Sequence, residues 1–192
     1  AEEGGIIPPS FFALTMIHLT LHSPLSLGTV QLRNRIALAP MAGLTDVPFR
    51  TLAWQFGAGH MVSEMVASRL DLWQTQKSQL RREALPCAAP MAVQMAGNDP
   101  SVMAETARRL VDEGAALIDI NFGCPAKKVC RRAAGSALLA DLDRVAAIVE
   151  NVSSAVDVPV TVKTRTGLVV GDQVGIATVR AAEQAGARMV VM

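Results

Sequence analysis

The sequence predicts an α/β fold, a (β/α)8 TIM barrel truncated after about the sixth strand. Two observations favour this fold: short apolar runs alternate with helical patterns, and polar residues follow the ends of several different runs. Alternating strands and helices favour parallel strands joined by right-handed crossovers. A site assembled from many strand ends is typical of a barrel. A third observation is the absence of a glycine-rich nucleotide-binding motif after the first run, which argues against a doubly wound sheet.

The predicted strands are nearly continuous apolar runs, as expected for strands that are covered on both faces. They are residues 36–40, 60–65, 91–95, 117–121, 158–163 and 187–192. The preceding residues 25–35 are expected to form a small hairpin that turns at Gly28-Thr29 and closes the bottom of the barrel. Six strands are two fewer than a closed barrel of this type contains.

Helix signals lie between most of these runs. Helix starts are marked by Asp99 with Pro100, by Asp141 (for a helix through about Ala155) and by Asp172. Aspartate accepts hydrogen bonds from the free N–H groups of a first helical turn, and proline fits that turn. Glycines that end helices precede the next apolar run at Gly57, Gly114 and Gly186.

Composition indicates a globular domain. Of 192 residues, 51% are hydrophobic and 18% are charged. Because the net charge is only +1, nucleic-acid binding could be indicated only by a local cluster of basic residues. Three cysteines without paired spacing favour a reducing cytoplasm over a disulfide scaffold. Residues 1–24 fit neither a signal peptide nor a membrane span. We therefore expect a poorly ordered N-terminal extension, followed by the barrel part from residue 25 to residue 192.

The stretch DINFGCPAKKV, residues 119–129, places a cysteine just past the end of a buried strand. A single cysteine is more often a small buried hydrophobic residue than a catalyst, so Cys124 has both interpretations. Asn121 supplies an amide that can bond a planar heterocycle at two points. Lys127 and Lys128 would stabilise a thiolate or receive an anionic substrate. They belong to a run of four cations, KKVCRR, which is either a solvated face or a set of phosphate contacts.

Polar residues also end other runs. Gln94 either caps strand ends or contacts a cofactor, and Lys163 needs a partner in the barrel mouth, such as a flavin N1–C2=O edge. Arg165 is expected on the same side as Lys163 if the strand continues. Glu64 either pairs with a cation such as Lys163 or belongs to the site. The cysteines and histidines show no metal-ligand spacing, so we expect no metal site.

A family resemblance rests on six segments in order. They are APMAGLTDVPFR (39–50), VSEM (62–65), QMAGNDP (94–100), DINFGCPAKKV (119–129), GSALL (135–139) and VPVTVKTRTG (158–167). Together they closely resemble the bacterial tRNA-dihydrouridine synthases, in particular the B branch. The resemblance implies a cytoplasmic FMN enzyme in which NADPH reduces the flavin and a hydride passes to a tRNA uracil. It also implies that two strands and a helical tRNA-binding domain are missing from these residues.

The resemblance assigns roles to the candidate residues. Cys124 would donate the proton to C5 of the uracil. Pro40, Met41 and Ala42 would lie against the flavin, Gln94 and Lys163 would bond its ring, Asn121 and Arg165 would hold the uracil, and Lys127, Lys128, Arg131 and Arg132 would contact the tRNA backbone. Two alternatives remain: another FMN barrel that reduces a free pyrimidine or an enone, and an inactive fragment that only binds RNA.

Overall fold

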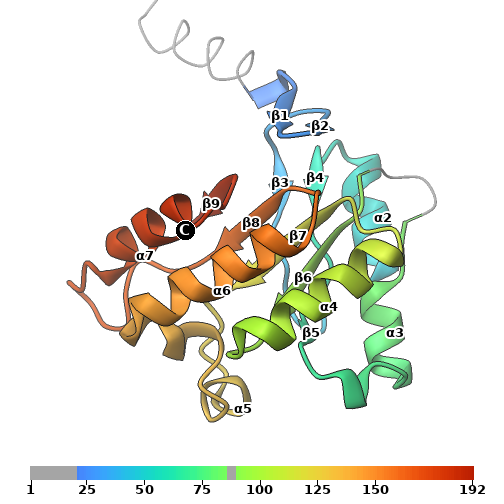
Figure 1. Ribbon diagram of the computed structural model, residues 1–192. Coiled ribbons are helices and arrows are strands. Elements are labelled where there is room, and N and C mark those ends of the chain that lie inside the picture. Colours follow the sequence, from blue (N-terminus) through green and yellow to red (C-terminus); the bar gives the residue numbers. More distant parts are fainter. Residues whose placement is uncertain (1–20, 86–89) are drawn as a thin grey trace, which may run out of the picture.

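A computed structural model describes residues 21–85 and 90–192. Figure 1 shows parallel strands with helices α4 and α6 packed side by side across one face, and the β1–β2 hairpin at one end of the sheet. Most of the predicted extension, residues 1–20, and Cys87 lie outside the described residues.

Each predicted apolar run contains a strand. They are β3 (Ala37–Leu38), β4 (His60–Met61), β6 (Ala92–Ala96), β7 (Leu117–Asn121), β8 (Val160–Lys163) and β9 (Met189–Val191). β3 pairs with β4 in parallel, and β6 to β9 pair in parallel in chain order, with the short β5 (Val66–Ala67) also beside β6. A bridge from Val62 to Ala92 connects the two groups. Six successive parallel strands in an open sheet confirm the truncated barrel.

The hairpin is also confirmed. β1 (Leu25–Leu27) and β2 (Val30–Leu32) pair antiparallel around Gly28-Thr29, where Gly28 has a positive φ of 56°. Leu27 and Leu32 are buried in one cluster with Val62, Ala92 and Leu117. These contacts close the N-terminal end of the barrel with apolar side chains.

The helices follow the predicted signals closely. They are α2 (Val47–Gln55), α3 (Gln76–Arg82), α4 (Pro100–Asp112), α5 (Lys127–Cys130), α6 (Leu142–Ala155) and α7 (Val174–Gln184), with 3-10 turns η1 (Leu70–Leu72) and η2 (Gly135–Ala140). Asp99 and Asp141 cap α4 and α6 as predicted, each accepting a backbone N–H at 2.9 Å. The prediction for Asp172 was one residue early, since Gln173 holds the cap position of α7. Asp172 instead bonds the N–H groups of Leu168 and Val174.

Strand alternation separates an apolar outer layer from a polar inner one. Val93, Ile118 and Val162 are fully buried in the main core, the cluster that also contains residues of α4 and α6. The residues that alternate with them are Gln94, Asp119 and Thr161, which are buried and polar. The apolar residues therefore pack the sheet onto the helices. The polar residues line the inner side of the sheet, near the C-terminal ends of the strands.

His60 is a buried histidine at the N-terminal end of the barrel strands. It lies at the start of β4, only 4% exposed, and within the described residues neither ring nitrogen has a hydrogen-bond partner. Burial lowers its pKa from 6.5 to about 4, because the protonated ring would lose its hydration.

His60 should therefore make stability pH-dependent. Between pH 6.5 and 4 the unfolded chain binds the proton and the folded chain does not, so the free energy of unfolding falls as pH drops through this window. The loss attributable to His60 is about 3 kcal/mol. Urea unfolding of His60→Leu should show a shallower acid decrease in the free energy of unfolding than the wild type. Parallel pH profiles for wild type and His60→Leu would contradict this.

Candidate active site

The candidate site begins with three polar side chains on neighbouring strands. Gln94 Nε2 on β6 donates to Asp119 Oδ2 on β7 at 2.7 Å, and Thr161 Oγ1 on β8 donates to Asp119 Oδ1 at 2.5 Å. Burial raises the pKa of the Asp119 carboxyl, while the hydrogen bonds from Thr161 and Gln94 and the charge of Lys163 act in the opposite direction. The carboxyl thus has polar partners on both sides inside the barrel.

This polar row continues to the predicted cysteine. Asn121 Nδ2 donates to Gln94 Oε1 at 2.9 Å. Asn121 Oδ1 accepts the N–H groups of Gly123 at 3.1 Å and Cys124 at 2.9 Å. The asparagine at the end of β7 therefore holds the turn that carries Cys124, whose side chain is half-buried.

A second turn supports Cys124 from the other side. The Cys124 carbonyl accepts the Ser136 N–H at 3.0 Å and lies 3.6 Å from Cys130 Sγ. Gly135 has a positive φ of 62°, and a Cβ there would come within 2.6 Å of the Cys124 carbonyl oxygen. Only glycine lets the two turns approach so closely. The GSALL segment is therefore part of the scaffold of the Cys124 turn.

Lys163 ends β8 beside this turn, and Arg165 follows it by two residues. Asn121 and Lys163 are direct partners in the parallel register. Across residues 21–85 and 90–192, the Lys163 ammonium forms no ion pair or hydrogen bond, although its charge acts on Asp119. Arg165 is half-buried two residues further along. Lys163 thus offers a cation without an ion-pair partner among the described residues at the strands' C-terminal end.

The loop after β3 contributes a third part of this end. Pro40 and Met41 are half-buried and Ala42 is exposed. Gly43 N–H donates to Glu64 Oε2 at 2.8 Å. This glutamate joins the loops after β3 and β4.

Glu64 pairs with a cation, as one of its two interpretations predicted, but the cation is Arg81 and not Lys163. Glu64 lies 3.5 Å from Arg81 Nε, and Arg81 also donates to the Met65 carbonyl. Arg81 belongs to α3, which the chain brings back over the loop that contains Glu64. A cavity of about 550 Å³ lies here, lined by residues that include Ala42, Glu64 and Arg81.

The predicted phosphate contacts lie on α5 and the turn after it. Lys127, Lys128, Arg131 and Arg132 are all exposed. Figure 1 shows α5 projecting from the end opposite the hairpin. Because α5 follows the Cys124 turn directly, its cations flank that turn.

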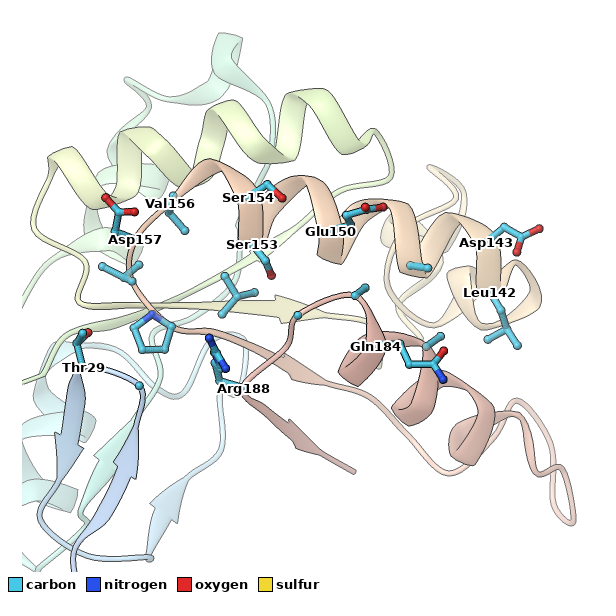
Figure 2. A pocket seen from close by; sticks show the side chains of 18 residues that line it. Thr29, Leu142, Asp143, Glu150, Ser153, Ser154, Val156, Asp157, Gln184 and Arg188 are labelled. Carbon is cyan, nitrogen blue, oxygen red and sulfur yellow. The ribbon is translucent and has the colours of Figure 1, made fainter.

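Another cavity, of about 780 Å³, lies away from these residues. Figure 2 shows it between α6, α7 and the hairpin turn, with Thr29, Ser153 and Arg188 among its lining side chains. None of the predicted site residues lines it. Within the described part of the chain there is no cluster of three metal-ligating side chains and no helix long and apolar enough to cross a membrane.

Sequence reasoning missed Asp119, Thr161 and Ser136. The signal for the first two was present, since a carboxylate in LIDIN and a hydroxyl in VTVK interrupt otherwise apolar strands. A charged residue at a fully buried strand position requires hydrogen-bonding partners. Ser136 acts through its backbone N–H, for which the side-chain type gives no signal.

The geometry and the comparisons identify the class of protein. A family model described as dihydrouridine synthase (Dus) matches residues 37–192. The chain therefore belongs to the dihydrouridine synthase family, which confirms the resemblance noted in the sequence.

Its relatives give the particular branch. The chain is 53% identical to tRNA-dihydrouridine synthase B of Pseudomonas putida over 164 residues, covering 85% of this chain and 49% of that protein. It is 55% identical to tRNA-dihydrouridine synthase B of Escherichia coli K12 over 141 residues, covering 73% of this chain and 44% of that protein. The chain spans about half the length of the curated relatives it matches.

Solved structures support the fold. Histamine dehydrogenase from Rhizobium sp. 4-9 aligns with a TM-score of 0.55 at 13% identity, over 91% of this chain and 42% of that one. A 2,3-dimethylmalate lyase aligns with a TM-score of 0.54 at 18% identity, over 93% and 60% of the two chains. At these identities the likeness concerns the fold alone.

Proposed function

We propose that this chain supplies part of the active site of a cytoplasmic, FMN-dependent tRNA-dihydrouridine synthase. In this reaction the C5=C6 bond of a tRNA uridine is reduced at the expense of NADPH. The observation that carries the proposal is the Cys124 turn. It is held by Asn121 at the end of β7, beside the positive charge of Lys163.

The residues at the strands' C-terminal end fit a flavin. Lys163 provides a cation for an electron-rich ring edge, and within the described residues it has no ion-pair partner. Pro40, Met41 and Ala42 supply a largely apolar loop of the kind that packs against a ring. Gln94 is 1% exposed and already bonds Asp119 and Asn121, so any contact it makes to a ring uses its second amide hydrogen or the second lone pair of its oxygen. Bound FMN would supply the hydride chemistry.

The protein's own residues would position the uridine and supply the proton. Asn121 is paired with Lys163 in the register and Arg165 follows Lys163 by two residues, and both side chains can donate hydrogen bonds to a base. Cys124 stands in the half-buried turn beyond the strand, where its thiol can act as the general acid toward C5. A base in a folded tRNA must leave its stack to reach such a site. The exposed cations of α5 would hold the neighbouring phosphates.

The test separates cofactor binding from RNA binding. FMN is titrated into the purified chain, followed by NADPH and then unmodified tRNA, with visible absorbance as the readout. We expect flavin absorbance that bleaches with NADPH and returns with tRNA but not with free uracil. Lys163→Met should weaken FMN binding by about 10–100-fold, because it removes a charged hydrogen bond. Lys127→Met should leave FMN affinity unchanged and slow only the tRNA-driven recovery.

Each result distinguishes the alternatives. Recovery with free uracil as efficient as with tRNA would favour a reductase of small pyrimidines. Binding of tRNA without any flavin spectrum would favour an RNA-binding fragment. An equal effect of Lys127→Met and Lys163→Met on FMN affinity would contradict the assignment of Lys163 to the ring.

A further inference from the structure

Asp119 has no role in the chemistry described so far, yet its contacts lead to Cys124. It is 3% exposed on β7, one pleat below Asn121. The path runs from Asp119 Oδ2 through the Gln94 amide and the Asn121 amide to the Cys124 N–H. Its three hydrogen bonds measure 2.7, 2.9 and 2.9 Å.

Both ends of this path determine how the amides are oriented. A carboxylate oxygen accepts hydrogen bonds, so the Gln94 NH2 group must face Asp119 and the Gln94 oxygen must face Asn121. At the other end, the backbone N–H groups of Gly123 and Cys124 can only donate, so the Asn121 oxygen must face them. The two requirements agree. If the Gln94 amide were flipped, its oxygen would face the carboxylate oxygen of Asp119. If the Asn121 amide were flipped, its NH2 group would face the backbone N–H groups of Gly123 and Cys124.

We propose that Asp119 is a positioning residue for Cys124. By accepting from Gln94, it holds the Gln94 oxygen toward Asn121, and this supports the Asn121 orientation that binds the Cys124 N–H and the turn around it. The same orientation leaves Asn121 one amide hydrogen for a ligand. The catalytic meaning of this role rests on the function proposed above, whereas the positioning itself is a property of the chain alone.

Thr161 provides a matched comparison. It bonds Oδ1 of Asp119, whereas the path to Cys124 starts from Oδ2. Removing the Thr161 hydroxyl therefore disturbs the carboxyl without breaking the path. Asp119→Asn also preserves the path, because its amide oxygen can accept from Gln94 while its NH2 group donates to Thr161. Asp119→Leu keeps the number of side-chain heavy atoms and the branch at Cγ, and has no acceptor.

The experiment measures hydrogen exchange of individual backbone amides by NMR in the 192-residue chain, without flavin or RNA. Asp119→Leu should raise the exchange rates of the Gly123 and Cys124 N–H groups by about tenfold or more. Asp119→Asn and Thr161→Val should stay within about threefold of the wild type. Amides of α4 should be unchanged in all three variants and report on global stability.

Unchanged exchange at Cys124 in Asp119→Leu would overturn the proposal. An equal increase in Asp119→Asn would also overturn it, because packing rather than an acceptor would then be responsible. If Asp119→Leu also loses protection in α4, Gln94→Met removes the next link with similar volume, and the same increase at Cys124 is expected. The readout needs neither FMN nor tRNA, so a failure of the proposed activity leaves it interpretable.

Discussion

Under the proposed function, replacing Cys124 with alanine is expected to slow the reduction of tRNA uridine by about 10²–10⁴-fold, the usual contribution of a positioned general acid. The thiol stands at the end of β7 in a turn held by Asn121 on one side and by Ser136 on the other. Alanine removes the proton donor and leaves those backbone contacts intact. The rate is measured in a single turnover, after NADPH has reduced the flavin and before tRNA is mixed in.

Two controls separate proton donation from damage to the turn. Flavin reduction by NADPH should be unaffected in Cys124→Ala, since that step needs no proton at the base. Cys130→Ser keeps a donor next to the Cys124 carbonyl and should leave the uridine step within a few-fold of the wild type. Equal losses in Cys124→Ala and Cys130→Ser would refute the assignment, because the effect would then come from the shape of the turn.

The strand pattern was predictable because burial on both faces demands continuous apolar runs. Each run held a strand, and the caps Asp99 and Asp141 fell where their side chains bond the first turn. The second run was shorter than predicted, since β4 ends at Met61. Beyond Met61, the Gln94 N–H donates to the Ser63 hydroxyl. A side-chain oxygen, rather than a backbone carbonyl, is therefore its acceptor there.

The site was predictable where its residues end strands and unpredictable where partners come from distant elements. Cys124 and Lys163 follow β7 and β8, and the parallel register places these strand ends side by side. Arg81 reaches Glu64 only because α3 packs back over the loop after β4, a tertiary contact without a local signal. The support from Gly135 likewise depends on how closely two turns approach, a distance that strand and helix periodicities do not encode.

Replacing Phe122 with alanine is expected to lower the free energy of unfolding by about 3–5 kcal/mol, the usual effect of removing a large aromatic side chain from a core. Phe122 is fully buried in the main core, the cluster that also contains Leu138 and Leu139 of η2. Phe122→Met fills most of the same volume with a flexible apolar chain, so its loss should stay below about 1.5 kcal/mol. Urea unfolding monitored by far-UV circular dichroism measures both.

The position of Phe122 connects this stability to the site. It lies between Asn121, which holds the Cys124 turn, and Gly123, whose N–H that asparagine binds. Its own N–H donates to the Lys163 carbonyl at 2.8 Å and its ring is buried in the main core, so Phe122 attaches the ends of β7 and β8 to that core. Phe122→Ala should therefore expose Cys124 to iodoacetamide at urea concentrations well below the global transition, and Phe122→Met should not. Coincident loss of Cys124 protection and of circular dichroism in Phe122→Ala would instead show that the turn unfolds only with the whole core.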